Sequence, residues 1–246
     1  MYEIDDIVNK VHCSDCLQFM RNIPDKSIDL IVTSPPYNQK LTTQDTTMIL
    51  YQDNKKHDEY IDFIRELFKN VHRILNKKGS FFYNYKTNVQ ENVLFPAFKH
   101  LLEANEETKF LISAEIVWNY AGNFDSAKTR FPTDYEMIYQ LTKTPDYNFY
   151  CQDQCLSSVW NMKHVMANTL EKKECGLHPC PYPKSIIEKI MLYSTKSNDL
   201  ILDPFLGSGT TAVAAKELGR RFIGIEIEPK YVEIATRRLQ QEYLQL

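Results

Sequence analysis

Residues 33–37, TSPPY, directly follow the apolar, β-branched run IDLIV and end it abruptly. Pro35 and Pro36 lack a backbone N–H and have a fixed φ, so they stiffen the segment and cannot continue a hydrogen-bonded ladder. A stiff tip holds carbonyl oxygens and a hydroxyl at fixed positions. The Pro35 carbonyl and Ser34 Oγ can accept hydrogen bonds from a substrate NH₂ group, and Tyr37 offers a flat face to a planar ring. These four residues predict a receptor for an exocyclic amine on a heterocycle.

The chemistry that suits such a receptor is transfer of a group to the amine of a nucleobase. That nitrogen is a poor nucleophile because its lone pair is delocalised into the ring. Acceptors for both of its hydrogens draw it toward tetrahedral geometry, and its lone pair can then attack a sulfonium methyl carbon in line. The rate acceleration comes from positioning of the reactants and from fixed dipoles, and no covalent intermediate forms on the enzyme. A base within a duplex must flip out to reach this site, so we expect it to stack on Tyr37.

A second segment whose residues could take part in chemistry lies at residues 200–219. Its sequence, LILDPFLGSGTTAVAAKELG, predicts a strand, a turn and a helix. Asp203 ends the strand, Gly207 and Gly209 allow a tight turn, and the helix begins at the two threonines that follow. Ligands of open α/β sheets bind at the carboxyl ends of strands, so a cofactor is expected at this loop. The residues concerned are Asp203, Phe205, Gly207, Ser208, Gly209, Thr210 and Thr211.

The next predicted strand, RFIGIE, ends at Glu226, where a carboxylate can accept hydrogen bonds from both hydroxyls of a ribose. The glycine loop lacks the Gly-Lys-Ser/Thr ending of a phosphate loop and does not follow GxGxxG. It also has no lysine to neutralise phosphate charge. This combination favours a nucleoside cofactor without a polyphosphate, and S-adenosyl-L-methionine is such a cofactor.

Alternating strands and helices must position these segments. Apolar runs bounded by turns predict parallel-sheet strands at 28–33, 80–85, 111–118, 199–203 and 221–226, with a further strand at 134–141 near an edge. Helical patterns cover 58–75, with 76–79 as the stop, and 184–194, 210–219 and 229–243. The alternation indicates a doubly wound, mostly parallel α/β sheet. Two irregular pieces interrupt it, at 38–57 and at 144–178.

The bulk composition narrows the class of protein. A chain of 246 residues suits one α/β domain with an elaboration, or two small domains. A net charge of −3 argues against a generally basic coat but leaves room for a local basic cleft. No apolar run approaches a membrane span and the first ten residues do not resemble a signal peptide, so we expect a cytoplasmic protein. The sequence has six cysteines, among them Cys13 and Cys16, which we interpret as packed or idle thiols rather than as a zinc site or disulfides. No metal is expected, and His164 and His178 are interpreted as packing or loop residues.

The pair SPPY and DPFLGSG resembles the DNA amino-methyltransferases, which methylate adenine N6 or cytosine N4. The tetrapeptide precedes the glycine loop, as in the circularly permuted β group of that family. The similarity extends through HCSDCLQFMRNIPDKSIDLIVTSPPY, EIVWNY, RFPTDYEMIYQL, SVWNM and HPCPYPKSIIEKIM, almost from end to end. It implies a seven-stranded methyltransferase fold, with Asp15 near the cofactor's adenine and Pro183 in the segment that completes the cofactor pocket.

The resemblance also implies an organisation of the chain. Residues 1–143 would be the catalytic part, 144–178 a small target-recognition insertion, and 179–246 the cofactor-binding part of the same domain. The expected partners are double-stranded DNA, a cognate restriction endonuclease and a second copy of the chain. Expected DNA contacts are Lys40, Lys55, Lys56, Lys128, Arg130, Lys163, Lys172 and Lys173, which would bind phosphates while a few polar side chains read base edges.

Other readings stay open. Pro179-Cys180 and the run Glu-Asn-Val at 91–93 occur in cytosine-C5 methyltransferases, but their order relative to each other and to the glycine loop is inverted here, and 91–93 is interpreted as the start of a surface helix. Protein-glutamine methyltransferases have an Asn-Pro-Pro-Tyr tip after the glycine loop. An RNA amino-methyltransferase and a catalytically idle DNA-binding module of the same fold are further alternatives. Ser34 is similar to the cytosine-N4 members and favours that base over adenine N6.

Overall fold

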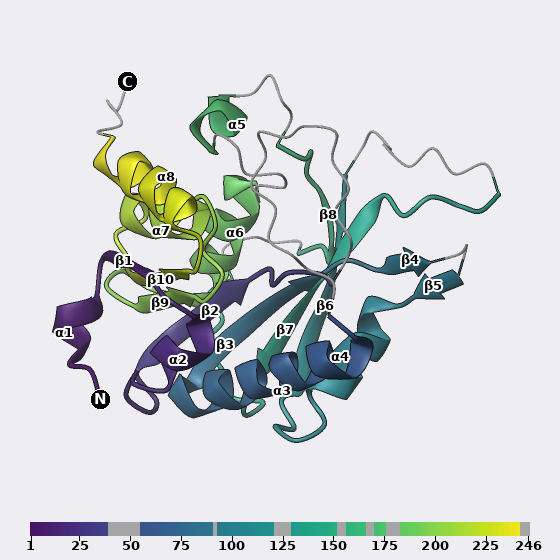
Figure 1. Ribbon diagram of the computed structural model, residues 1–246, viewed down its shortest axis with the longest axis horizontal. Helices are drawn as coiled ribbons and strands as arrows, with labels where there is room; N and C mark the ends of the chain where they lie inside the picture. Colours follow the sequence, from purple (N-terminus) through teal and green to yellow (C-terminus); the bar gives the residue numbers. More distant parts are fainter. Residues whose placement is uncertain are drawn as a thin grey trace.

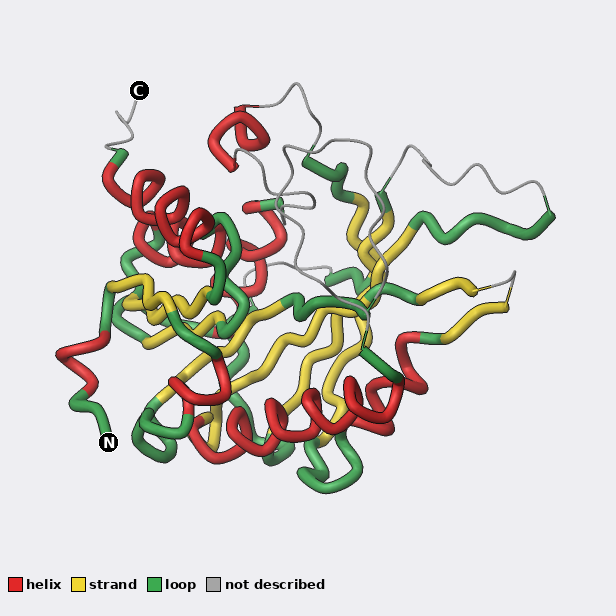
Figure 2. The backbone as a smooth tube through the Cα atoms, in the orientation of Figure 1, coloured by secondary structure: helices red, strands yellow, loops and turns green. Residues whose placement is uncertain are grey.

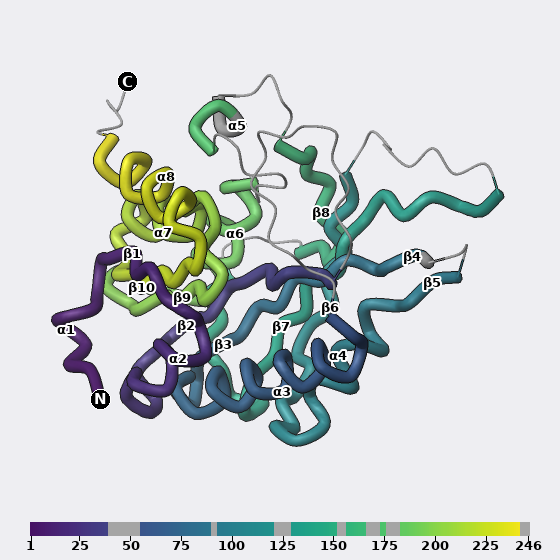
Figure 3. The backbone as a smooth tube through the Cα atoms, in the orientation of Figure 1, coloured from purple at the N-terminus to yellow at the C-terminus, as the bar shows by residue number. Residues whose placement is uncertain are grey.

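The computed structural model describes residues 1–38, 55–90, 93–120, 129–151, 156–165, 170–175 and 183–241. A central sheet in this part of the chain is built from β1 (Lys10–Cys13), β2 (Ile28–Thr33), β3 (Leu75–Tyr85), β6 (Leu111–Asn119), β7 (Tyr135–Thr142), β8 (Val159–Asn161), β9 (Leu200–Asp203) and β10 (Arg221–Glu226). Its strand order is β1-β10-β9-β2-β3-β7-β6-β8 (Figure 1). Figure 3 shows how β1, near the N-terminus, lies beside β10, near the other end of the chain.

All neighbouring strands are parallel except β7, which runs antiparallel to both β3 and β6. The doubly wound, mostly parallel α/β sheet is therefore confirmed. The sheet has eight strands among the described residues, not seven, because β8 adds a parallel strand beside β6. The expectation that the strand at 134–141 lies near an edge is wrong: β7 lies between two strands and is buried along almost its whole length.

Helices cover both faces of the sheet (Figure 2). The helices of the described residues are α1 (Ile4–Ile7), α2 (Cys16–Met20), α3 (His57–Ile74), α4 (Ala97–Ala104), α5 (Leu170–Cys175), α6 (Lys184–Ser194), α7 (Thr210–Glu217) and α8 (Pro229–Gln240). One core cluster joins α2, α3 and α4 to the sheet, and a second joins α6, α7 and α8 to it. The sheet therefore separates two hydrophobic cores, as in a three-layer α/β fold.

Helix α3 follows from its apolar spacing. Tyr60, Ile64, Leu67 and Val71 recur every three or four residues and are buried, as the sequence predicts. The helix ends at Ile74, one residue before the predicted end, and the residues of the predicted stop at 76–79 belong to β3 rather than to a loop. Gly79 lies inside that strand, where an added Cβ would lie 2.7 Å from the Asp29 carbonyl oxygen, so the strand needs a glycine at this close approach.

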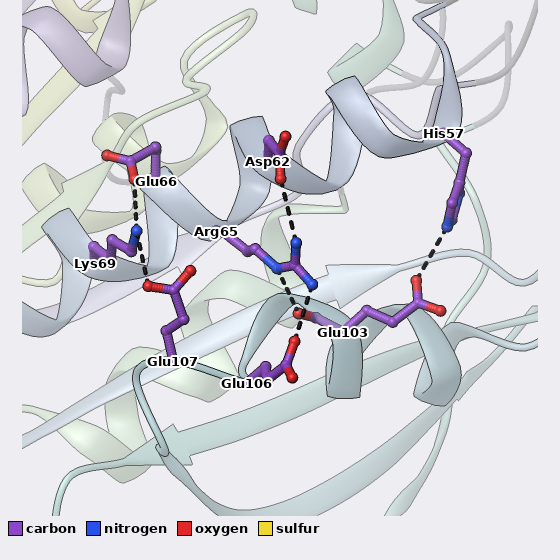
Figure 4. Close-up of polar contacts among 8 residues, drawn as sticks. All are labelled: His57, Asp62, Arg65, Glu66, Lys69, Glu103, Glu106 and Glu107. Atoms are coloured by element: carbon purple, nitrogen blue, oxygen red, sulfur yellow. Dashed lines mark hydrogen bonds and ion pairs between the residues drawn. The ribbon is translucent and has the colours of Figure 1, made fainter.

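The outer surfaces of α3 and α4 are joined by polar contacts (Figure 4). Arg65 on α3 pairs with Asp62, 3.2 Å away, and with Glu106, 3.0 Å away, just after α4. The Arg65 Nε–H also donates to the carbonyl oxygen of Glu103 at 3.2 Å. Because these charges are partly exposed, each pair adds little stability, about 0–1 kcal/mol, and the main attachment of the two helices is the apolar core beneath.

A hairpin of β4 (Asn88–Gln90) and β5 (Val93–Phe95) precedes α4. The predicted surface helix at 91–93 is wrong at Val93, which pairs within the hairpin, while residues 91 and 92 lie outside the described residues. The helix begins only after Pro96, whose φ of −62° and extended ψ form its N-cap. The apolar run Val-Leu-Phe before that proline suits a strand.

The segment 144–178 is partly integrated into the sheet. β8 pairs with β6 in register Trp118↔Trp160, and the Trp118 indole N–H donates to the Met162 carbonyl oxygen at 2.8 Å. Of the other irregular piece, residues 39–54 lie outside the described residues. Within the described part of the chain, no helix combines the length and apolar character needed to cross a membrane.

Candidate active site

The two motifs that the sequence singled out meet at the carboxyl edge of the sheet. β2 and β9 are neighbouring parallel strands, so the tip at residues 34–37 (the SPPY tip) and the loop at residues 203–211 (the glycine loop) emerge side by side. The Thr33 hydroxyl, directly before the tip, donates to Asp203 Oδ1 at 2.9 Å, and both residues are buried. This bond joins the tip to the loop across two strands that are far apart in sequence.

Asp203 organises the turn after β9. Its Oδ1 also accepts the Phe205 backbone N–H at 3.0 Å, and its Oδ2 accepts the Thr211 hydroxyl at 2.6 Å. Burial raises the pKa of Asp203 to about 6, and the hydrogen bonds from Thr211, Phe205 and Thr33 oppose this rise. The carboxylate therefore faces the protein's own donors and shapes the loop from within.

The two loop glycines are required by the backbone. Gly207 has φ of 56° and Gly209 has φ of 92°, both in the left-handed region that favours glycine. Gly209 is also the N-cap residue of α7, and a Cβ there would lie 2.7 Å from the Cβ of Ala235 on α8. Close packing of α8 against the loop thus excludes any larger side chain, as the sequence predicts for a tight turn.

Glu226 lies at the end of β10, the strand next to β9. Its Oε2 accepts the Gly207 N–H at 2.8 Å and its Oε1 accepts the Glu228 N–H at 2.8 Å. Burial raises the pKa of Glu226, and these backbone hydrogen bonds oppose the rise. The same residue's carbonyl accepts the Ser14 N–H at 3.0 Å, which brings the neighbouring Asp15 to this end of the sheet. There Asp15 caps α2 through Oδ1 and the Gln18 N–H, 2.9 Å apart.

Arg238 on α8 holds the glycine loop through hydrogen bonds. The sequence did not lead us to predict this role. Arg238 Nη1 donates to the Ser208 carbonyl oxygen at 2.7 Å and to Thr210 Oγ1 at 3.2 Å, with only 2% of the residue exposed. A signal was available, because Tyr231, Ala235 and Arg238 have the spacing of one buried helix face. An arginine on such a face needs a polar partner, and the loop supplies it.

Tyrosines fix the backbone of the SPPY tip. The Tyr60 hydroxyl donates to the Pro36 carbonyl oxygen, and the Tyr85 hydroxyl donates to the Tyr37 carbonyl oxygen at 3.3 Å. The rings of Tyr37 and Tyr85 meet edge to face, with centroids 5.3 Å apart. The tip is therefore held by α3 and β3 in addition to the stiffness of its own prolines.

The side chains of the tip continue into a buried polar cluster that the sequence reasoning also missed. Ser34 Oγ and the Tyr37 hydroxyl are 2.6 Å apart, and the Tyr37 hydroxyl donates to Glu136 Oε2 at 3.1 Å. Asn84 Nδ2 on β3 donates to the same carboxylate oxygen at 2.7 Å and to the Tyr37 hydroxyl at 2.6 Å. The possible signals were a charged residue inside the apolar run YEMIYQL and an amide inside SFFYNY. Burial raises the pKa of Glu136.

A cavity of about 740 Å³ opens beside Tyr37. Its lining includes the rings of Tyr37, Tyr60, Tyr85 and His100, together with Lys55. The His100 ring stacks on Tyr85 with centroids 3.9 Å apart, and burial lowers the pKa of His100 to about 3, so this ring is neutral at pH 7. The cavity is therefore lined by aromatic residues next to the tip and by charged residues, among them Lys55, Lys99 and Glu103.

The remaining residues that the sequence singled out lie outside the SPPY tip and the glycine loop. Lys56, Lys163 and Lys173 are exposed, whereas Arg130 is half-buried and its Nη1 donates to the Phe131 carbonyl oxygen at 3.0 Å. Pro183 is buried as the N-cap residue of α6. Lys40, Lys128 and the side chain of Lys172 lie outside the described residues, as do His178, Cys155 and Cys180. Cys13, Cys16 and Cys175 are free thiols, and the centroid of the His164 ring lies 3.8 Å from that of the Tyr120 ring.

Comparison with known proteins gives a consistent result. The family model described as DNA methylase matches residues 28–237. The chain is 32% identical over 263 residues to the Type II methyltransferase M.BglII of Bacillus subtilis, covering 96% of this chain and 70% of that protein. It is 30% identical over 253 residues to the DNA adenine methyltransferase YhdJ of Escherichia coli (strain K12), and this match covers 92% of this chain and 80% of that protein. In fold it is similar to the PvuII DNA methyltransferase (cytosine-N4-specific), with a TM-score of 0.79 and 22% identity over 96% of this chain and 87% of that one. It is also similar to M1.HpyAVI in its complex with SAM, with a TM-score of 0.66 and 24% identity over 94% and 99%.

Proposed function

The chain belongs to the N6/N4 family of DNA methylases and is an S-adenosyl-L-methionine-dependent DNA methyltransferase; we propose that it methylates the exocyclic amine of a base flipped out of duplex DNA at a specific site. The observation that carries this proposal is the Thr33–Asp203 hydrogen bond, because it joins the start of the SPPY tip, the proposed amine receptor, to the glycine loop, the proposed cofactor site. Methyl transfer requires this proximity, since donor carbon and acceptor nitrogen must meet in line.

The residues of the glycine loop and its neighbours fit a nucleoside cofactor. Each carboxylate oxygen of Glu226 accepts one backbone N–H and has a second lone pair, so it can also accept a ribose hydroxyl. The described loop carries no lysine or arginine of its own that would bind a polyphosphate. We propose that the cofactor is held by Asp15, Pro183, Asp203, Phe205, Gly207, Ser208, Gly209, Thr210, Thr211 and Glu226. S-adenosyl-L-methionine, when bound, supplies an electrophilic methyl group on a sulfonium.

The chain's own residues then act on the substrate amine. We propose that Ser34 Oγ and the Pro35 carbonyl oxygen accept hydrogen bonds from its two N–H groups. Pro36 keeps the tip stiff, and Tyr37 stacks on the flipped base. The hydrogen bonds from Tyr60 and Tyr85 to the tip's carbonyl oxygens support this role, because they fix the backbone that aims these acceptors. The aromatic cavity beside Tyr37 offers room for a base outside the helix.

We propose cytosine N4 as the target, because a serine hydroxyl is a neutral acceptor, weaker than a carboxylate, as in the cytosine-N4 members that Ser34 resembles. Adenine N6 is the competing target, and similarity to a protein named DNA adenine methyltransferase favours it. The test is to incubate the protein with unmethylated DNA and S-adenosyl-L-methionine, digest the DNA to nucleosides and identify the product by mass spectrometry. N4-methylcytosine would support the first target and N6-methyladenine the second, and no methylated nucleoside would refute the function.

DNA would reach the tip past the segment 144–178, which we propose as the target-recognition region. The exposed Lys56, Lys163 and Lys173 and the half-buried Arg130 support phosphate contacts there and around the tip, with Lys40, Lys55, Lys128 and Lys172 as further candidates. The Type II methyltransferases among its relatives support a role in protecting sites from a cognate restriction endonuclease. A homodimer is also proposed, and sedimentation of the purified protein tests it.

Two substitutions separate chemistry from cofactor binding. Ser34→Ala should reduce methyl transfer severely while leaving the Kd for S-adenosyl-L-methionine close to that of the wild type, because the receptor loses an acceptor. Glu226→Ala should weaken cofactor binding, since the ribose loses its acceptors and the Gly207 N–H loses its partner. Calorimetric titration with the cofactor and a methyl-transfer assay measure both. Normal turnover in the first variant, or an unchanged titration in the second, would contradict the assigned roles.

A further inference from the structure

The SPPY tip has a charged group behind it that the proposed function does not use. Glu136 comes from β7, is 6% exposed, and lies one hydroxyl group away from Ser34, through Tyr37. Its carboxylate is therefore buried within hydrogen-bonding distance of the tip. A carboxylate this deeply buried is costly unless it is well hydrogen-bonded, and its bonds are made to the tip itself and to Asn84.

The direction of each hydrogen bond in this cluster follows from counting protons. A carboxylate only accepts, so the single proton of the Tyr37 hydroxyl is directed to Glu136. The Tyr37 oxygen must then act as acceptor toward Ser34, and the Ser34 proton points inward to it across 2.6 Å. Ser34 Oγ also accepts a hydrogen bond from Asn84 Nδ2 at 3.4 Å. With its only proton directed into the protein and one lone pair used by Asn84, Ser34 Oγ has one lone pair left to offer. A hydroxyl in this state is an acceptor toward the substrate and cannot act as a donor to it.

Asn84 agrees with this direction. Its Nδ2 donates to Glu136 and to the Tyr37 hydroxyl, while its Oδ1 is buried and finds no hydrogen-bond partner among the described residues. The opposite orientation would turn the amide oxygen against the carboxylate. The amide thus leaves one acceptor unsatisfied, at a cost typical of a buried polar atom, in order to donate toward the charge.

We propose that Glu136 is a positioning residue that, through Tyr37, fixes the Ser34 hydroxyl as a hydrogen-bond acceptor toward the substrate amine. The inference rests on the proposed function and adds to it a residue outside the SPPY tip. It explains how a serine, which can donate or accept, behaves as an obligate acceptor. It also accounts for selection of an amine, because a carbonyl at the same place on the base, as in uracil or hypoxanthine, would face a lone pair.

Protonation of Glu136 would remove this constraint, because a neutral carboxyl group can also donate. Burial raises the pKa of Glu136, and Asn84, the nearby Lys86 and Tyr37 oppose the rise. On β6, the strand that flanks β7 on the side opposite β3, Trp118 pairs in register with Glu136 and has no titratable group. The rate of methyl transfer should therefore fall as the pH drops through a pKa above 4.5, the ordinary value for glutamate.

The test compares Glu136→Gln with Glu115→Gln, a matched control on the neighbouring β6 whose side chain is exposed. A glutamine amide can donate or accept, so Glu136→Gln keeps the size of the side chain and loses the fixed direction. Using unmethylated DNA and tritiated S-adenosyl-L-methionine, we expect its kcat to fall about 10- to 100-fold, as for loss of an oriented hydrogen bond to a charged group. The Kd for the cofactor and the melting temperature should stay at wild-type values, and the acid limb of the pH–rate profile attributable to Glu136 should disappear. The control should match the wild type in all four.

Tyr37→Phe provides a second, independent variant, because it keeps the ring and removes only the hydroxyl that links Glu136 to Ser34. The double variant Tyr37→Phe/Glu136→Gln should be no slower than Tyr37→Phe alone, since both changes interrupt one chain of hydrogen bonds. Additive losses, or a Glu136→Gln enzyme with wild-type kcat and pH profile, would overturn the inference while leaving the proposed function intact. A wild-type protein that transfers no methyl group to DNA would overturn both.

Discussion

Thr33→Val would cut the hydrogen bond between the SPPY tip and the glycine loop while keeping the shape of the side chain. Valine is β-branched like threonine, so the strand geometry of β2 is preserved. Asp203 Oδ1 would lose the Thr33 hydroxyl at 2.9 Å and keep only the Phe205 N–H. The site is buried, with Thr33 2% and Asp203 6% exposed, so water cannot easily replace the lost donor. The full effect of the deletion should therefore appear in the free energy of unfolding.

The magnitude follows from the charge of the acceptor. A hydrogen bond to a charged group contributes about 1.5–3 kcal/mol, and one to a neutral group about 0.5–1.5 kcal/mol. For a domain of this size each kcal/mol shifts the melting temperature by about 2–4 °C, so the expected loss at about pH 8 is roughly 3–12 °C. Burial raises the pKa of Asp203 to about 6, and Thr33 helps to oppose that rise. Below that pH Asp203 is protonated in both proteins, so the destabilisation should shrink by about half at pH 5.

The assay is differential scanning calorimetry at about pH 8 and pH 5, with cofactor titration at the higher pH. Thr236→Val, at an exposed position of α8, is the matched control and should change the melting temperature by less than about 1 °C. We also expect weaker binding of S-adenosyl-L-methionine, because the glycine loop loses one of its attachments. A melting temperature at pH 8 equal to that of the wild type, or a loss that is larger at pH 5 than at pH 8, would refute the reasoning.

Three further predictions concern the supports of the site. Gly209→Ala should weaken cofactor binding and cost about 1–3 kcal/mol of unfolding free energy from overpacking against α8, whereas Gly219→Ala, with φ of 68° but 3.5 Å of space, should show backbone strain alone; thermal melts and cofactor titration compare them. Arg238→Met should cost about 1–3 kcal/mol and weaken cofactor binding because the Ser208 carbonyl loses its donor, while Arg237→Met at the exposed neighbour should do neither in urea unfolding. His100 has its pKa lowered from 6.5 to about 3, so its contribution to stability is complete above pH 6.5 and is lost as the pH falls toward 3; His100→Gln should flatten the pH dependence of unfolding by up to about 5 kcal/mol over that range, and an unchanged slope would contradict it.

The parts of the fold that the sequence predicts well are those where burial is complete. β2 and β10 have the predicted limits, 28–33 and 221–226, and α6 coincides with 184–194. A strand covered by helices on both faces must be apolar throughout, so its ends are marked by the first polar or turn residues. The glycine loop was predictable for a similar reason, because its backbone needs positive φ at two positions that only glycine adopts easily.

The edges of the sheet were not predictable in this way. β1 has the sequence KVHC and is exposed at both of its ends, and β8 has only three residues. Neither forms an apolar run, because an edge strand is stabilised by pairing with a neighbour that is distant in sequence. Glu136 and Asn84 were missed for a related reason: their burial and their pairing with the tip depend on how β3 and β7 align in the folded sheet. Pairing between distant segments leaves no periodic signal.

The buried acids of this site share a property that connects stability to function. Asp203, Glu226 and Glu136 all have pKa values raised by burial, so each charge lowers the stability of the folded protein at neutral pH relative to an exposed carboxylate. All three lie at or near the SPPY tip and the glycine loop and accept hydrogen bonds from them. A core selected for stability alone would replace such groups by apolar or neutral ones. Their retention at one edge of the sheet is what a preorganised site requires, because donors and acceptors fixed before the substrate arrives need no rearrangement during the reaction. Neutral replacements there should therefore preserve or raise the melting temperature where packing is conserved, as in Glu136→Gln, and lose turnover.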